Sequence, residues 1–243
     1  MLSMKRRIRA ALTPEPGHEF PVGNDKMVAF GPQFETVEDY LKTAYLCLSL
    51  DDKTAFRKVL GDIFAEYIAQ FDRWRAAVQG PPVTLIYLIW KIGAYEQLPK
   101  VVAAFNAATL EREEVEEILF ALFCVIANAR RSALIREVLA QIVDGPQFLA
   151  RYAIEALKIE LEHHPRDVLA VIQKYAPYIN ATCVTAETPP CSDDDRRELC
   201  ENFAELQEAA NAPRLREPMN GIFRKYHTQP GDWMELVKKI VSN

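Results

Sequence analysis

The sequence predicts an all-α fold, and three observations lead to this prediction. Glycine is scarce, with nine in 243 residues, whereas residues that lose little freedom in a helix (Ala, Leu, Glu, Lys and Arg) fill long stretches. Apolar residues recur at positions i, i+3, i+4 and i+7, and no strand-like alternation of any length appears. Hydrophobic residues make up 49% of the chain, so we expect a packed core rather than disorder.

Residues 111–131, EREEVEEILFALFCVIANARR, run from five glutamates through ten apolar residues to two arginines. A membrane-spanning helix needs about 20 apolar residues, so this segment is too short to cross a bilayer. The acids and arginines suit the two ends of a helix dipole, with Thr109 as the expected N-cap. Because residues 118–127 are apolar all round, we expect neighbouring helices to cover this helix on most sides.

Helices are also expected at 36–50, where Thr36 and Asp39 form a capping-box-like start, and at 52–79, ending before Gly80, Pro81 and Pro82. After Pro82, short turns separate the predicted helices at regular intervals. The short turns predict antiparallel neighbours among the helices at 82–93, 95–108, 110–129, 131–143, 146–162 and 165–176.

The second helix of each of the last three pairs carries a similar apolar stripe. Phe105, Ile142 and Tyr175 hold matching places in these stripes and lie 37 and 33 residues apart. This period resembles that of HEAT- or armadillo-like α-solenoids and covers residues 33–180. The resemblance implies stacked antiparallel helical hairpins and no particular activity. An irregular multi-helix bundle is the alternative arrangement.

The two ends of the chain differ from this core. Residues 13–35 are rich in proline and glycine and predict an extended lead-in, and residues 180–191 predict a loop. Ser192 with Asp195, and Asp232 with Glu235, are capping pairs for two C-terminal helices. We therefore expect three parts: a basic arm with its lead-in at 1–32, a helical core at 33–180, and a loop with C-terminal helices at 181–243.

Charge is distributed unevenly. The net charge of −5 argues against a surface built throughout to neutralise phosphates. Residues 186–208 hold eight acids and two bases, whereas residues 213–239 hold six bases and three acids, so these segments can pair within or between chains. The helix after Ser192 also has a coiled-coil-like stripe, which predicts self-association through Leu199, Phe203 and Leu206.

Five cysteines without a secretory signal before them indicate a reducing, intracellular and most simply cytoplasmic setting. Cys47 and Cys124 lie in apolar helical surroundings, where a thiol behaves as a small hydrophobic group. The remaining three do not have the close pairing of a structural zinc site, so we expect no metal or other cofactor there: Cys183, Cys191 and Cys200.

One pair has the spacing of a metal site. Glu160 and His163 form a Glu-x-x-His pair, as in di-iron bundles, but no second pair lies in a helical segment. An enzyme or metal protein with a site near Glu160, His163 and His164 is one hypothesis. The other is that the two histidines complement the C-terminal dipole of their helix.

The N-terminus, MLSMKRRIRAAL, places Lys5, Arg6, Arg7 and Arg9 among apolar residues. Four functions fit this pattern: attachment to an anionic membrane, contact with nucleic-acid phosphates, a nuclear or organellar address, and packing on acidic faces of the same protein.

Chemical motifs such as phosphate loops, GxGxxG, HExxH and the nucleophile elbow are missing from the sequence. We therefore expect a non-enzymatic interaction or assembly protein that binds another protein or copies of itself. Arg130, Arg131 and Arg136 are candidates for the edge of its binding surface. The alternative is a peripheral structural protein that holds an anionic membrane or nucleic acid through residues 1–12.

Overall fold

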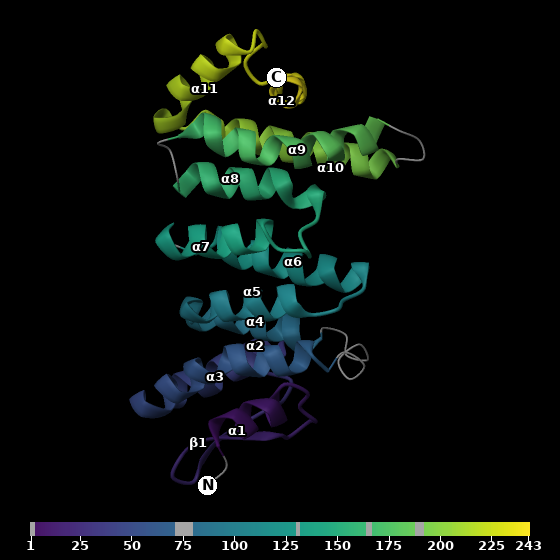
Figure 1. Cartoon of the computed structure of the whole chain (residues 1–243). Helices are drawn as coiled ribbons and strands as arrows, with labels where there is room; N and C mark the ends of the chain where they lie inside the picture. The colour runs from purple at the N-terminus through teal and green to yellow at the C-terminus, as the bar shows by residue number, and fades with distance from the viewer. Residues whose placement is uncertain (1–2, 71–79, 130–131, 164–166, 188–191) are drawn as a thin grey trace. The chain divides into compact units, whose positions relative to one another are not determined.

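The computed structural model describes residues 3–70, 80–129, 132–163, 167–187 and 192–243 (Figure 1). The predicted all-α class is confirmed, because helices dominate these residues and the sheet among them has two strands. None of the described helices is both long and apolar enough to cross a bilayer. The chain divides into two compact units, Met1–Gln147 (unit 1) and Phe148–Asn243 (unit 2).

The N-terminal lead-in is folded, contrary to the prediction of an extended segment at 13–35. Helix α1 (Met4–Ala11) is followed by an antiparallel hairpin of β1 (Glu19–Gly23) and β2 (Lys26–Ala29). Asp25 has a φ of 58°, which suits the tight turn between the strands. The phenolic O–H of Tyr40 lies 3.1 Å from the carbonyl of His18 and 3.3 Å from that of Val28. The strands were missed because five and four residues are too few to show an alternation.

The helices of unit 1 lie against the next helix but one along the chain. Their bounds are α2 (Val37–Cys47), α3 (Leu50–Ile68), α4 (Pro81–Ile92), α5 (Leu98–Ala107), α6 (Arg112–Ala127) and α7 (Ser132–Val143), with a 3₁₀ turn η2 (Tyr95–Gln97) before α5. Helix α4 contacts α2 and α6, and α5 contacts α3 and α7 (Figure 1). The predicted helix at 52–79 is confirmed to Ile68, and its stretch at 71–79 lies outside the described residues.

The turn after α4 is held by a residue from α3. Gly93 ends α4 with a φ of 68°, a conformation that favours glycine. The Arg57 guanidinium donates to the carbonyl of Gly93 at 2.9 Å and to that of Ile92 at 3.4 Å. It also donates to both carboxylate oxygens of Glu96, at 2.8 and 2.6 Å. One side chain thus satisfies orphan carbonyls at a helix end and orients the next turn.

Helix α6 differs from its prediction at its N-terminus. Its N-cap is Glu111, which forms a capping box with Glu114, and not Thr109. Its apolar run is buried on most sides, as expected, but Phe120 is 58% exposed whereas Phe123 is 3% exposed. The other side chains from Ile118 to Ile126 are buried except Cys124, which is half-buried.

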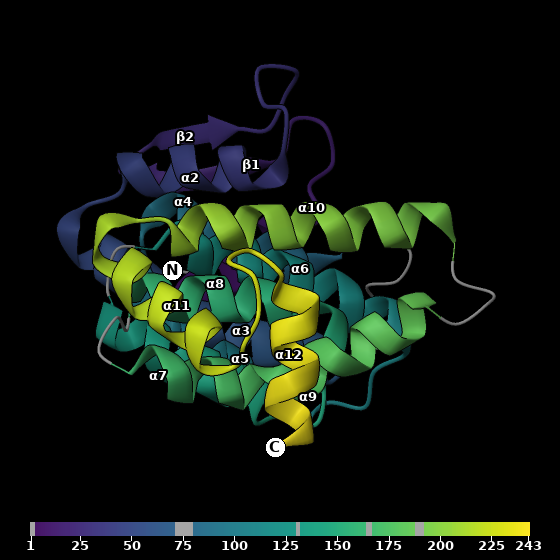
Figure 2. The same cartoon turned by 90° about the horizontal axis from the view of Figure 1, so that it is seen from above.

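Unit 2 consists of a 3₁₀ turn η3 (Ala150–Tyr152) and the helices α8 (Ala153–His163), α9 (Val168–Glu187), α10 (Asp193–Ala210), α11 (Pro213–Lys225) and α12 (Trp233–Ser242). Helix α9 contacts α8, α10, α11 and α12. The indole of Trp233 packs edge-on against Phe223, 5.4 Å between ring centroids, where α12 lies beside α11 (Figure 2).

Two predictions for unit 2 are wrong. The helix expected at 146–162 begins at Ala153, because 3₁₀ geometry precedes it. Helix α9 does not stop at 176 but continues through Pro177 to Glu187, so the loop predicted at 180–191 is helical as far as 187. Proline removes one backbone hydrogen bond. Burial of Ile179, Cys183 and Ala186 beyond it offsets that loss.

The capping predictions at the other helices are confirmed. The Thr36, Ser192 and Asp232 side chains each accept a hydrogen bond from the backbone N–H three residues on, at 3.2, 3.1 and 3.1 Å respectively. The three apolar stripes are also buried, except for Ala170: they contain Leu98, Val101, Val102, Phe105, Ile135, Val138, Leu139, Ile142, Val168, Val171, Ile172 and Tyr175.

Phe120 and Phe123 form a matched pair for testing which side of α6 faces the core. Replacement of the buried Phe123 by Ala leaves a cavity and should lower the free energy of unfolding by about 3–5 kcal/mol. Phe120→Ala should cost less than about 1 kcal/mol, because most of that ring already contacts water. Urea unfolding followed by circular dichroism measures both values, and equal costs would contradict the placement of α6.

Candidate functional site

The basic N-terminal residues lie on a docked helix. Ser3 accepts a hydrogen bond from the backbone N–H of Arg6 at 3.4 Å and so caps α1. Ile8 and Ala11 of this helix are fully buried, and α1 lies against α3. The apolar face that a membrane would receive is therefore covered within unit 1.

Three of the four basic side chains are engaged inside unit 1. Lys5 and Arg9 both form ion pairs with the carboxylate of Glu66. The Arg7 guanidinium lies 4.9 Å from the centroid of the Phe20 ring, and burial lowers its pKa although Asp52 opposes this shift. Arg6 is exposed. These contacts match the hypothesis of a basic arm packed on its own protein, and anion binding by this arm stays a prediction.

The predicted arginine edge is described only in part. Arg136 is half-buried on α7, while Arg130 and Arg131 lie outside the described residues. The predicted self-association stripe on α10 faces the interior of unit 2 instead of solvent. Leu199 is 7% exposed, Leu206 is fully buried and Phe203 is half-buried, and self-association through this stripe stays a prediction.

The candidate metal pair is occupied by other side chains. Tyr175 donates its phenolic hydrogen to Glu160 at 2.5 Å, and the ammonium of Lys174 lies 3.3 Å from the same oxygen. His163 is half-buried at the end of α8, and His164 lies outside the described residues. A metal ion would have to displace both donors from Glu160. Among the described residues, no three potential ligands gather at one point. An enzyme or metal site here stays a hypothesis.

The cysteines occupy contrasting environments. Cys183 is buried in α9, and burial is the main reason why its pKa is raised to about 11, with a further contribution from Glu187. Cys47 and Cys200 are exposed, so the expectation of an apolar setting for Cys47 is wrong. Cys47 lies on the outer side of α2, next to the exposed Leu46. Cys191 lies outside the described residues.

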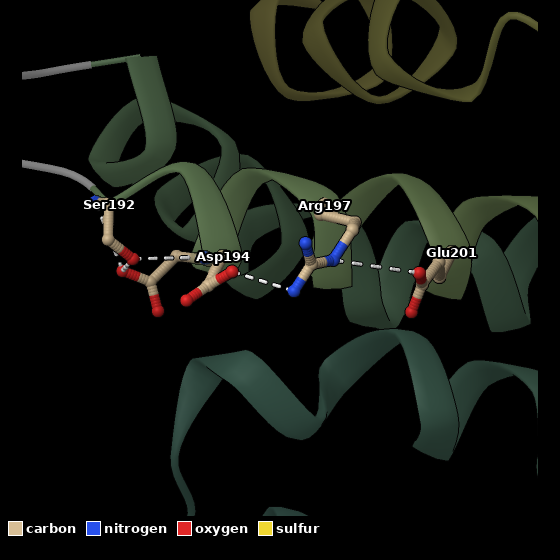
Figure 3. Close-up of polar contacts among 5 residues, drawn as sticks. Ser192, Asp194, Arg197 and Glu201 are labelled. Carbon is tan, nitrogen blue, oxygen red and sulfur yellow. Dashed lines mark hydrogen bonds and ion pairs between the residues drawn. The ribbon is translucent and has the colours of Figure 1, made fainter.

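The acidic and basic segments near the C-terminus pair mainly with nearby groups. Arg197 lies between Asp194 and Glu201 along α10, with N–O distances of 2.6 and 4.0 Å (Figure 3). Glu205 pairs with Lys158 of α8 at 2.7 Å. The expected pairing between 186–208 and 213–239 is represented by the ion pair of Lys238 with Glu187 at 2.9 Å.

A shallow hollow lies where α11 and α12 end, lined by Lys225, Tyr226, His227, Lys239 and Asn243. The ammonium of Lys239 donates to the carbonyl of His227 at 2.9 Å and lies 3.4 Å from Glu235. Lysines at the ends of two helices stabilise the negative poles of their dipoles. Helix electrostatics therefore explains why Lys225 and Lys239 lie here.

A second surface was not predicted from the sequence, and we call it the aromatic–acidic face. It consists of Tyr87 and Trp90 on α4 and Glu117 and Phe120 on α6, with Glu38 of α2 beside Tyr87. Trp90 is 37% exposed and Phe120 is 58% exposed. Their exposure could not be predicted from the sequence, because periodicity marks a residue as apolar but does not show which side of a wholly apolar helix stays uncovered.

Helices α2, α4 and α6 meet at this face, because α4 contacts both of the others. Burial raises the pKa of Tyr87, and negative charge at Cys124, Glu38 and Glu117 raises it further. Burial also raises the pKa of Glu117, together with repulsion from Glu114. The groups that shift these two pKa values are all acidic. Lys91, which follows Trp90 on α4, pairs with Asp39 of α2 at 2.7 Å.

Glu38 of α2 is a buried acid near Tyr87. It is 2% exposed, and its Oε1 accepts no hydrogen bond among the described residues. Burial of a carboxylate without full hydrogen bonding is unfavourable, and its field extends further through protein than through water. No family model, curated protein or solved structure matches the chain, so this face is interpreted from its own chemistry.

Thiol reactivity should follow burial. At pH 8, iodoacetamide should alkylate Cys47 and Cys200 within minutes, while Cys183 should react at least about 100-fold more slowly, because its pKa near 11 leaves very little thiolate. Peptide mass spectrometry over a time course measures each site. Unfolding in urea should remove the difference, and fast native labelling of Cys183 would contradict the burial.

The raised pKa of Glu117 predicts a pH-dependent effect of its removal. The folded state holds this proton more tightly than the unfolded state, so the ionised carboxylate destabilises unit 1 above its folded pKa and the penalty disappears as the pH falls. Glu117→Gln should raise Tm at pH 7 by roughly 1–2 °C and have less effect near pH 4. Differential scanning calorimetry at both pH values provides the measurement. A larger gain at the lower pH would show that the sign is wrong.

Proposed function

We propose that the protein is a non-enzymatic, all-helical interaction or assembly protein that binds another protein or copies of itself. The observation that carries the proposal is the exposure of large aromatic side chains on the aromatic–acidic face. Phe120 lies within an apolar run in which neighbouring side chains on both sides are buried. Large apolar groups that gather on a surface are typical of binding sites, since their transfer from water is favourable.

The mechanism follows from the composition of this face. Aromatic side chains dominate the energetics of protein interfaces, whereas charged groups at the rim determine the choice of partner and the rate of association. Trp90 and Phe120 supply candidate anchors, and Glu117 supplies charge beside them. Binding therefore depends on the shape and charge of a surface and requires no reactive group.

Multi-angle light scattering and a pull-down from native extract test the proposal together. Either an oligomer at micromolar concentration or a partner retained in a fixed ratio is expected. Phe120→Ser should weaken this association by about tenfold, because a central aromatic anchor is removed.

Leu50→Ser provides the matched control, because Leu50 is 80% exposed at the start of α3 and lies outside the aromatic–acidic face. The control should leave association unchanged. A lone monomer in light scattering combined with no retained partner would overturn the proposed function.

A further inference from the structure

The aromatic–acidic face combines an exposed acid, Glu117, with large exposed aromatic side chains. On α10, by contrast, both arginines pair with acids of the same helix, as Arg197 does with Asp194. On α1, two bases share one glutamate. At the aromatic–acidic face, Lys91 follows Trp90 and pairs with Asp39 at 2.7 Å, so this lysine is already engaged. A cation from outside the chain can therefore bind beside Glu117.

The aromatic side chains indicate which partner residues would lie next to the bound cation. Trp90 follows Tyr87 by one helical turn on α4, and Phe120 follows Glu117 by one turn on α6. Each helix thus presents an exposed aromatic ring beside the acidic groups. Such rings bind apolar side chains, and their faces also attract ammonium and guanidinium groups.

We propose that the aromatic–acidic face docks a segment of a partner protein that presents Lys or Arg side chains next to large apolar ones. This inference rests on the proposed interaction function and specifies the partner's chemistry. The buried carboxylate of Glu38 and the exposed carboxylate of Glu117 attract the cation, while Trp90 and Phe120 contact the apolar residues. The raised pKa values of Tyr87 and Glu117 support this charge balance.

Two basic segments of the described residues do not match this description. In α1, Ile8 and Ala11 are buried and two of the bases pair with Glu66. In α11, the arginines are exposed but the large apolar residues are buried: Leu215, Met219, Ile222 and Phe223. We therefore assign the basic segment to a different protein, and a second copy is an alternative outcome of the test.

Three short fluorescein-labelled peptides of equal length are suitable probes. The first combines Lys and Leu at helical spacing, the second replaces Lys by Glu, and the third replaces Leu by Ser. Fluorescence anisotropy with the full chain should show that the Lys–Leu peptide binds at least about tenfold more tightly than either of the others. Equal binding of the Lys–Ser peptide would mean that the aromatic rings contribute nothing and would overturn the proposal.

Variants then locate the bound peptide. Phe120→Ser and Glu117→Gln should each weaken binding of the Lys–Leu peptide by about threefold to tenfold, whereas Leu50→Ser and Glu201→Gln should not. These controls remove an exposed leucine and an exposed acid from other surfaces. Thermal unfolding confirms that each variant is folded. If the two controls weakened binding as much as the test variants, the peptide would be bound by net charge alone and the proposal would be wrong.

The outcomes separate this inference from the function on which it rests. If an oligomer or partner is found but the Lys–Leu peptide does not bind at this face, the interaction function stands and the docking proposal fails. Cross-links between copies through Phe120 would likewise replace the proposed partner by a second copy. If the peptide binds at the face and neither an oligomer nor a partner is found, the surface is confirmed and the proposed function is not.

Discussion

The structure of unit 1 depends on contacts between helices that are separated by one other helix in the chain. An amphipathic helix is unstable alone in water and becomes stable when another element covers its apolar side. In unit 1 the contacts of α4 with α2 and α6, and of α5 with α3 and α7, provide this cover. Helix α4, which is apolar around much of its surface, lies between two such neighbours. Its uncovered side carries Trp90.

The sequence was informative where local physics determines the structure. Helix starts at Thr36, Ser192 and Asp232 could be predicted because a capping side chain bonds to the backbone three residues away. The buried stripes could be predicted because their spacing is local as well. Helix α9 shows where this approach fails. Pro177 is a local signal to stop, whereas the apolar contacts that keep α9 helical to Glu187 come from other helices.

The functional surface was harder to predict for the same reason. A basic cluster such as Lys5, Arg6, Arg7 and Arg9 is conspicuous in a sequence, but its countercharge at Glu66 comes from a helix far along the chain. Phe120 shows the converse, since nothing in residues 118–127 distinguishes the one large ring that stays exposed. Charge imbalance and exposure are properties of neighbouring helices taken together. They become visible only when the packing of those helices is known.

The contact of Arg57 with the end of α4 also bears on the order in which the chain acquires its structure during synthesis. The carbonyls of Ile92 and Gly93 receive hydrogen bonds from a side chain that leaves the ribosome before them. Each nascent turn of this kind can therefore be completed by a helix that is already available, without waiting for later residues. As the chain is synthesised from its N-terminus, each new turn can then pack on helices that have already formed. The backbone carbonyls of such a turn receive hydrogen bonds soon after they are made.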